Sequence, residues 1–285
     1  MHSEIILVAE TGSDITPAAA ETWGIYLVPM HVTMGDVCLD DGTFPSDEVC
    51  AYYDRTGKVP TTSASAPVDF ELVFDEIHSR WPEKKILHLA YSAVTTCSYQ
   101  NALLAAEERD YVVSVDTKHV SVGQGTVVLE TARWLKAHPE ATVEEAAEAA
   151  KSIAARVKMC FIPQNLDYLR AGGRVSNAAA MVGNLLGLHP CIEIEDGKLL
   201  AKKKYRGKTE VVIPTLVKDF MEKYNIDTEC LHFIWAPGLK DSSRAAAEKA
   251  AADLGVRSVG WNKTGCVITS HGGAGAFGIV GFSKE

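Results

Sequence analysis

The chain has 285 residues, of which 47% are hydrophobic, and this length predicts two domains with sizeable cores. Its net charge of −9 argues against a nucleic-acid partner and against a polybasic membrane anchor, because both require a basic surface. The seven cysteines include no C-x-x-C pair, and the first apolar run, 5–9, is too short for a signal-peptide core or a membrane span. We therefore expect a cytoplasmic protein with reduced thiols and without stable membrane insertion.

In the first half of the chain, short apolar runs alternate with helical patterns. Phe70, Val73, Phe74 and Ile77 have the i, i+3, i+4, i+7 spacing of a core-facing helix that begins near Pro67. Thr142 and Glu145 predict a capping box at the start of another helix, and Ser46 predicts a helix N-cap. The other elements expected here are strands over 4–9, 25–34, 36–39, 85–91 and 111–116, and helices over 17–23, 98–108 and 125–138. This order predicts a parallel, Rossmann-like sheet with helices on both faces.

The second half has a different pattern. Asp196-Gly197 lies between two strand-like runs, 191–195 and 198–205, and predicts an antiparallel hairpin. Further predicted elements are helices over 211–224 and 242–254, and strands over 230–236, 265–269 and 278–282. The change in pattern predicts an α/β protein of two domains, 1–157 and 158–285, the second of them carrying the antiparallel hairpin.

Hydroxyl and glycine residues gather where several expected strands end. In open α/β sheets, ligands bind beyond the carboxyl ends of the strands, and hydroxyls with free N–H groups there favour an anion. Capping and turn formation are the alternative role of such residues. The stretches concerned are 10–14, 61–65, 92–98, 172–174 and 270–275.

The sequence lacks the common catalytic motifs. It has no G-x-S-x-G, no H-E-x-x-H and no Walker A pattern. Residues 273–278 match G-x-G-x-x-G, but only seven residues follow, too few for a dinucleotide-binding βαβ unit. We therefore predict no catalytic residue, no metal site and no cofactor.

Several stretches resemble the DegV family, the fatty-acid-binding subunits of bacterial fatty-acid kinases. The most specific is L-D-Y-L-R-A-G-G-R-V-S over 166–176, which is similar to the family's L-x-Y-L-x-x-G-G-R-I-S. The other stretches that resemble family motifs are Thr62-Ser63 before Pro67, 92–102, Asp196-Gly197, 205–208 and 265–278. The chain departs from the family pattern at Glu10-Thr11-Gly12, at Ala64-Ser65-Ala66, at 95–98 and at Ala274.

The resemblance implies a two-domain DegV-like fold that holds one long-chain fatty acid in a buried tunnel. It further implies that a separate fatty-acid kinase catalytic subunit phosphorylates the exposed carboxylate for phospholipid synthesis, so that the chain itself is a lipid carrier and not an enzyme. Carried over by motif, the residues expected at the carboxylate are Thr62, Ser63, Ser92, Thr95, Thr96 and His271. Those expected to contact the ligand or the partner are Gly172, Gly173, Arg174 and Arg206.

Two alternatives remain at this point. One is a stand-alone enzyme, a kinase or hydrolase acting on a small polar substrate. The other is a binding protein for another lipid-like ligand. The chain length and saturation of a bound fatty acid cannot be read from the sequence.

Overall fold

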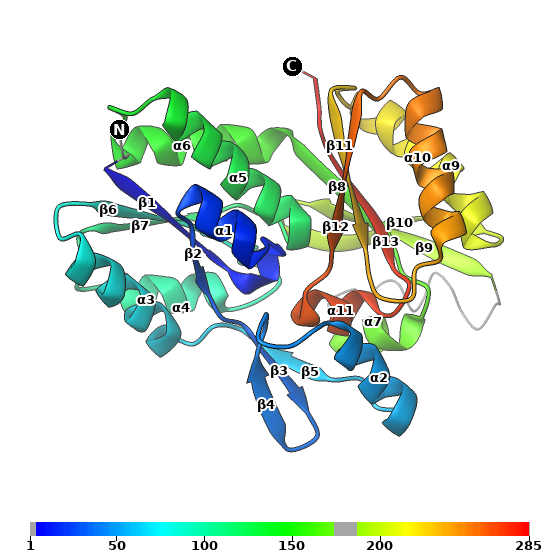
Figure 1. The fold of residues 1–285 in the computed structure, drawn as a ribbon, viewed down its shortest axis with the longest axis horizontal. Helices are drawn as coiled ribbons and strands as arrows, with labels where there is room; N and C mark the ends of the chain where they lie inside the picture. The colour runs from blue at the N-terminus through cyan, green and yellow to red at the C-terminus, as the bar shows by residue number, and fades with distance from the viewer. Residues whose placement is uncertain (1–3, 174–186, 285) are drawn as a thin grey trace.

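In the computed structural model, which describes residues 4–173 and 187–284, the strands form three sheets (Figure 1). One sheet has four strands in the order β2-β1-β6-β7, and all of its pairings are parallel. A second has six strands in the order β10-β9-β8-β13-β11-β12, and a third has three in the order β4-β3-β5. The first and third sheets come from the N-terminal half of the chain, and the second begins with β8.

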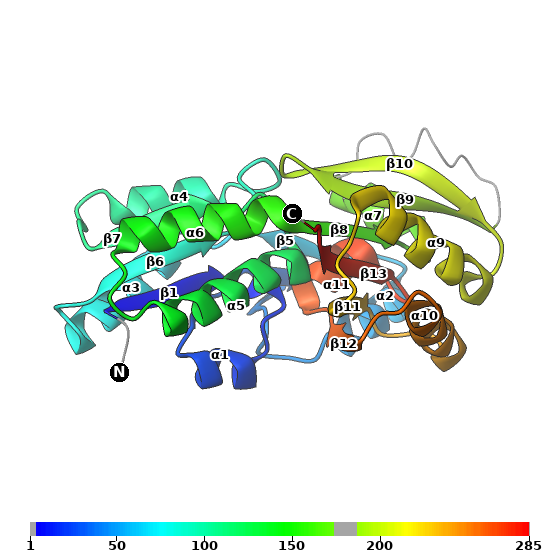
Figure 2. The same cartoon turned by 90° about the horizontal axis from the view of Figure 1, so that it is seen from above.

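The parallel sheet has helices on both faces, as predicted (Figure 2). Successive side chains of a strand point to opposite faces, so Ile6 and Val8 pack on α3 and α4, while Leu7 and Ala9 pack toward α1, α5 and α6. Its strands are β1 (Ile5–Glu10), β2 (Tyr26–Val28), β6 (Lys85–Ala90) and β7 (Val112–Asp116). Its helices are α1 (Pro17–Trp23), α3 (Pro67–Arg80), α4 (Ser98–Ala106), α5 (Ser121–Ala137) and α6 (Val143–Arg156), and the short 3₁₀ helix η1 (Thr11–Ser13) follows β1.

The strand predicted over 25–34 is two strands in two different sheets. Pro29 and Met30 separate β2 from β3 (His31–Met34), and the Met30 N–H donates to Thr11 Oγ1 at 3.0 Å instead of to a strand. A proline cannot donate to a β-ladder, which explains the break. β3 pairs with β4 (Val37–Asp40) and with β5 (Thr61–Ser63), a strand that the sequence did not predict, and α2 (Asp47–Thr56) lies between β4 and β5 in the chain.

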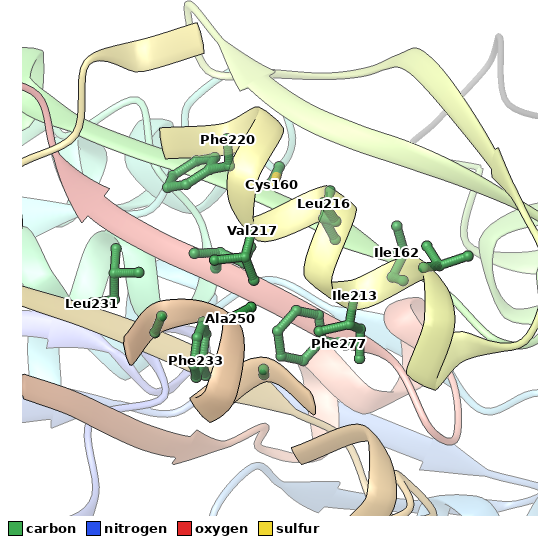
Figure 3. Packing of buried hydrophobic residues seen from close by; sticks show 14 of the residues in the cluster. Cys160, Ile162, Ile213, Leu216, Val217, Phe220, Leu231, Phe233, Ala250 and Phe277 are labelled. Carbon is green, nitrogen blue, oxygen red and sulfur yellow. The ribbon is translucent and has the colours of Figure 1, made fainter. Parts of the chain in front are cut away.

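The six-stranded sheet contains the predicted hairpin. β9 (Leu188–Glu195) and β10 (Lys198–Arg206) pair antiparallel across Asp196-Gly197, and β10 is an edge strand. The other strands are β8 (Val157–Ile162), β11 (Cys230–Trp235), β12 (Ser258–Lys263) and β13 (Phe277–Phe282), of which β8 and β12 were not predicted. One face is covered by α9 (Thr209–Tyr224) and α10 (Asp241–Asp253); Figure 3 shows Leu216 and Phe220 of α9 over the sheet, with Phe233 and Phe277 beneath the two helices.

The strand predicted over 265–269 is wrong, because this segment begins helix α11 (Cys266–Gly272). α11 packs against α7 (Leu166–Gly172) and lies beside β3, β5 and α2, where the two halves of the chain meet (Figure 1). The domain division at residues 157 and 158 stays a prediction. Within the described ranges, no helix is both long and apolar enough to cross a membrane.

Candidate functional site

A cavity lies between the six-stranded sheet and the loops that follow β2, β6 and β7. It encloses about 850 Å³ of empty space, counting the part open to solvent. Its walls are largely apolar, and the sheet contributes Met159, Phe161, Leu199, Ile234 and Phe277. Strand β5, the start of α5, the loops and α11 contribute its polar groups, which include Thr62, Ser63, Thr95, Thr96, Ser121, Thr264 and His271. The cavity therefore has an apolar side and a polar side, as a site for an amphipathic molecule requires.

Thr62 and His271 meet at the polar side. The Thr62 hydroxyl oxygen lies 2.8 Å from His271 Nε2, although 209 residues separate the two in sequence. Thr62 is on β5, and the loop after this strand is fixed because the buried Ser65 hydroxyl donates to the Pro29 carbonyl at 2.7 Å. Asn101 Nδ2 donates to the Ser65 carbonyl at 2.8 Å. A hydroxyl and an imidazole held in contact can both turn toward a carboxylate oxygen.

Two carboxyl groups from the N-terminal half hold the start of α11, and thereby position His271 near its end. Asp14 Oδ1 accepts from the Gly265 N–H at 2.7 Å, and Asp41 Oδ1 accepts from the Cys266 N–H at 2.8 Å. These bonds satisfy N–H groups that a helix start leaves without partners. Burial raises the pKa of Asp14 to about 8, against the hydrogen bonds from Ser121 and Gly265, and burial also raises the pKa of Asp41.

The double glycine of the L-D-Y-L-R-A-G-G stretch borders this pair. A Cβ atom at Gly172, the last residue of α7, would lie 2.4 Å from His271 Nδ1, so any side chain there would displace the imidazole. Gly173 has a φ of +64°, a left-handed conformation that favours glycine, and it ends α7. Gly172 therefore leaves room for the His271 imidazole, and Gly173 allows α7 to end at this position.

The hydroxyls of the 92–98 segment divide between two roles. Thr95 and Thr96 line the cavity, and the Thr95 hydroxyl donates to the Ser92 carbonyl at 2.9 Å. Ser92 is fully buried and does not line the cavity; its hydroxyl donates to the Gly197 carbonyl at 2.8 Å. Ser92 therefore anchors the β9–β10 turn, and this placement gives no support to its predicted contact with a carboxylate.

The structure places neither of the two predicted arginines at the cavity. Arg206 ends the edge strand β10, is exposed and does not line the cavity. Arg174 lies outside the described residues.

Within the part of the chain that the structure describes, no group of three His, Cys, Asp or Glu side chains is arranged to hold a metal ion.

Sequence reasoning missed a buried network behind the cavity wall. The carboxylate of Glu10, fully buried at the end of β1, accepts from the Tyr91 N–H at 2.9 Å, from the Ser98 hydroxyl at 2.7 Å and from Gln124 Nε2 at 2.7 Å. Burial alone would raise the pKa of Glu10, but His88, whose Nε2 lies 3.5 Å away, and the hydrogen bonds together lower it. Because Tyr91 lines the cavity, this network fixes part of its wall.

The departure from the family pattern at residue 12 also affects the wall. A Cβ atom at Gly12 would lie 2.8 Å from the Met30 sulfur and 3.1 Å from the Tyr91 ring, and both of these residues line the cavity. The glycine therefore allows the cavity wall to approach the end of β1 closely.

Known proteins resemble the chain over nearly its whole length. A profile of the DegV family, described as uncharacterised proteins, matches residues 4–284. A DegV domain-containing protein of Streptomyces coelicolor is 28% identical over 288 residues, with 100% of both chains covered. A solved structure of a DegV family protein from Thermus thermophilus, described as showing fatty acid binding, is 26% identical and has a TM-score of 0.84, covering 98% of this chain and 99% of that one. A DegV lipid binding protein from Thermotoga maritima is 26% identical with a TM-score of 0.81, and 99% of each chain is covered. The structural likeness confirms the predicted α/β fold class.

Proposed function

Because the chain belongs to the DegV family, we propose that it binds one long-chain fatty acid in the cavity and presents the carboxylate to a separate fatty-acid kinase. The observation that carries the proposal is a cavity with largely apolar walls and one polar side, which contains the paired Thr62 and His271. The relatives from Thermus and Thermotoga, described as fatty acid binding and lipid binding, support the same ligand class.

The tail of the fatty acid provides the binding free energy in this proposal. Burying about 15 carbons at ~0.8 kcal/mol per CH₂ is worth on the order of 12 kcal/mol before the costs of ordering and association are subtracted. Each neutral hydrogen bond to the head group adds only about 1 kcal/mol net. The hydroxyls of Thr62, Ser63, Thr95 and Thr96, with His271, therefore determine which end of the ligand faces outward more than how tightly it binds.

The proposal assigns phosphoryl transfer to the partner and not to this chain. Among the described residues, the polar side of the cavity has hydroxyls and the imidazole of His271, which can hold a carboxylate by hydrogen bonds while another protein phosphorylates it. In this role the chain works in the cytoplasm, where the kinase has access to ATP. Turnover of a small substrate by the isolated protein would favour the stand-alone enzyme instead.

We expect the purified protein to contain a fatty acid at close to one molecule per chain. Tail burial makes dissociation slow, so the ligand should survive purification. The measurement is solvent extraction of the denatured protein followed by mass spectrometry, which also identifies chain length and saturation. A clean extract, together with failure to bind added palmitate or oleate, would rule out the carrier function, and a different co-purified lipid would support the alternative ligand class.

Replacing His271 with alanine should weaken fatty-acid binding by roughly 1–3 kcal/mol, the worth of a hydrogen bond to a charged group. Acyl-phosphate formation with the cognate kinase should fall further than binding does, because the carboxylate loses its orientation. Titration with a fluorescent fatty acid and a kinase assay at saturating ligand measure the two effects separately. Equal losses in both assays would contradict an orienting role.

Arg206→Ala provides the matched comparison for that experiment. Arg206 is exposed on an edge strand and does not line the cavity, and in our proposal it contacts the kinase. Its replacement should leave fatty-acid affinity unchanged and slow acyl-phosphate formation, the reverse of a ligand-binding defect. A lower affinity for fatty acid, together with an unchanged rate of acyl-phosphate formation, would contradict the proposed contact.

A further inference from the structure

A second cleft opens at the starts of α9 and α10, apart from the fatty-acid cavity. It encloses about 890 Å³ of empty space, counting the part open to solvent. Its lining includes Lys208 and Thr209 from the start of α9, Lys240 and Ser243 from the start of α10, and the backbone of four glycines, Gly187, Gly207, Gly238 and Gly275. None of its lining residues belongs to the fatty-acid cavity.

Both helices start without a capping side chain. Lys208 and Lys240 occupy the two N-cap positions, and neither makes a side-chain cap hydrogen bond. Lysine has no acceptor with which to cap a helix, unlike the usual Ser, Thr, Asp or Asn. The first two N–H groups of each helix have no hydrogen-bond partner among residues 4–173 and 187–284. Two helix N-termini with free N–H groups, directed at one cleft, favour a bound anion.

The side chain of Ser243 provides a second and independent indication of a ligand. Ser243 is only 1% exposed, yet its hydroxyl has no hydrogen-bond partner within the described part of the chain, and it lies on the wall of the cleft. Polar groups with so little exposure are nearly always hydrogen-bonded in native structures, to protein, to ordered water or to a ligand. An anion in the cleft would accept the missing hydrogen bond.

The charges of the cleft suit one small anion. Lys208 and Lys240 are exposed and form no ion pair with a described residue, although the chain has a net charge of −9. Glu210 also lines the cleft, and its negative charge opposes the binding of an anion. The Thr209 hydroxyl is already engaged, because it donates to Gln164 Oε1 at 2.7 Å. Gly207 and Gly238, with φ of +138° and +91°, bring backbone without side chains to the cleft.

We infer that this cleft binds one phosphate group, with the two lysines, the free N–H groups of α9 and α10, and the Ser243 hydroxyl as its donors. A phosphate has several acceptor oxygens and up to two negative charges, which matches this set of donors from several directions. The site is separate from the fatty-acid cavity, so it does not depend on the proposed function.

Calorimetric titration with inorganic phosphate, at constant ionic strength and with chloride as the reference anion, tests the inference. We expect saturable binding of one phosphate per chain. The double variant Lys208→Gln, Lys240→Gln should weaken it at least about tenfold, the loss of a charge-assisted hydrogen bond. Ser243→Ala should weaken it about fivefold, as for a neutral hydrogen bond. Lys204→Gln is the matched control, since Lys204 is an exposed lysine on β10 outside the cleft, and it should bind as the wild type does.

A parallel titration with glycerol 3-phosphate distinguishes the source of the phosphate group. Tighter binding of the ester would identify a phosphorylated small molecule as the ligand, and equal binding would identify free phosphate. Wild-type protein that does not bind phosphate more strongly than chloride would overturn the inference. So would a loss in Lys204→Gln equal to that of the double variant. Fatty-acid content, measured in the same variants, should not change, so this result is independent of the carrier function.

Discussion

Ala236→Phe is expected to abolish stable fatty-acid binding. Ala236 follows β11, is buried and lines the cavity, and its N–H donates to the Ala276 carbonyl at 3.0 Å, so its backbone is fixed. A phenyl ring in this position would occupy space that our proposal assigns to the tail. If the ring displaces about five CH₂ groups, the loss is ~4 kcal/mol, or about a thousandfold in affinity. The measurement is the fatty-acid content of the purified variant, together with its affinity for a labelled fatty acid.

A second variant separates a filled cavity from a damaged fold. Met159→Leu changes another buried residue of the cavity wall but nearly preserves its volume, so it should bind fatty acid within a few-fold of the wild type. The thermal unfolding midpoint of Ala236→Phe should remain close to that of the wild type, because the added ring enters existing space. A folded Ala236→Phe protein that retains one fatty acid per chain would show that the ligand lies elsewhere.

The elements predictable from the sequence were those with local signals. The alternation of strands and helices in the first half identified the parallel sheet, and the Asp196-Gly197 pair identified the β9–β10 hairpin. The capping box at Thr142 and Glu145 is also present. In each case the residues that determine the structure are close in sequence, so propensity and spacing were sufficient.

Helix α11 was not predictable in this way because its start is stabilised from far along the chain. Its apolar, β-branched start, Val267-Ile268-Thr269, favours a strand by propensity. The carboxyl groups that accept from the N–H groups at its start, those of Asp14 and Asp41, are more than 220 residues away in sequence. Tertiary hydrogen bonds of this kind override a weak local preference, and no motif near residue 265 could reveal them.

The candidate site was only partly predictable for the same reason. Motif resemblance indicated Thr62 and His271, but only the folded chain shows them in contact. It also indicated Gly172, whose physical reason appeared only in three dimensions, as the 2.4 Å approach of its Cβ position to His271. It also indicated Ser92, whose hydroxyl donates to the Gly197 carbonyl of the hairpin turn, and its predicted contact with a carboxylate stays a prediction. The presence of a hydroxyl residue in a motif does not show which group its hydroxyl will hydrogen-bond in the folded chain.

The sequence indicates Glu10 only as part of the 10–14 stretch and as a departure from a family pattern, yet among the variants considered its replacement should cause the largest loss of stability. Its carboxylate is the shared acceptor for Tyr91, Ser98 and Gln124, and His88 lies beside it in the same dry interior. Removing the carboxylate leaves three donors without their acceptor and His88 without its neighbour. Because broken buried charged networks typically cost 3–5 kcal/mol, we expect Glu10→Ala to lower the free energy of unfolding by about that amount.

Urea unfolding at several pH values tests this prediction, with Glu4→Ala as the matched control. Glu4 is exposed just before β1, and its replacement should change stability by less than about 0.5 kcal/mol. The pKa of Glu10 is lowered from its ordinary value of 4.5, so its ionised form stabilises the folded chain above that pH, and this contribution is lost as the pH falls through the lowered pKa. The difference between wild type and Glu10→Ala should therefore be largest near neutral pH and shrink in acid. A Glu10→Ala protein no less stable than Glu4→Ala at pH 7 would show that the network contributes little, and that the wall beside Tyr91 is held by packing alone.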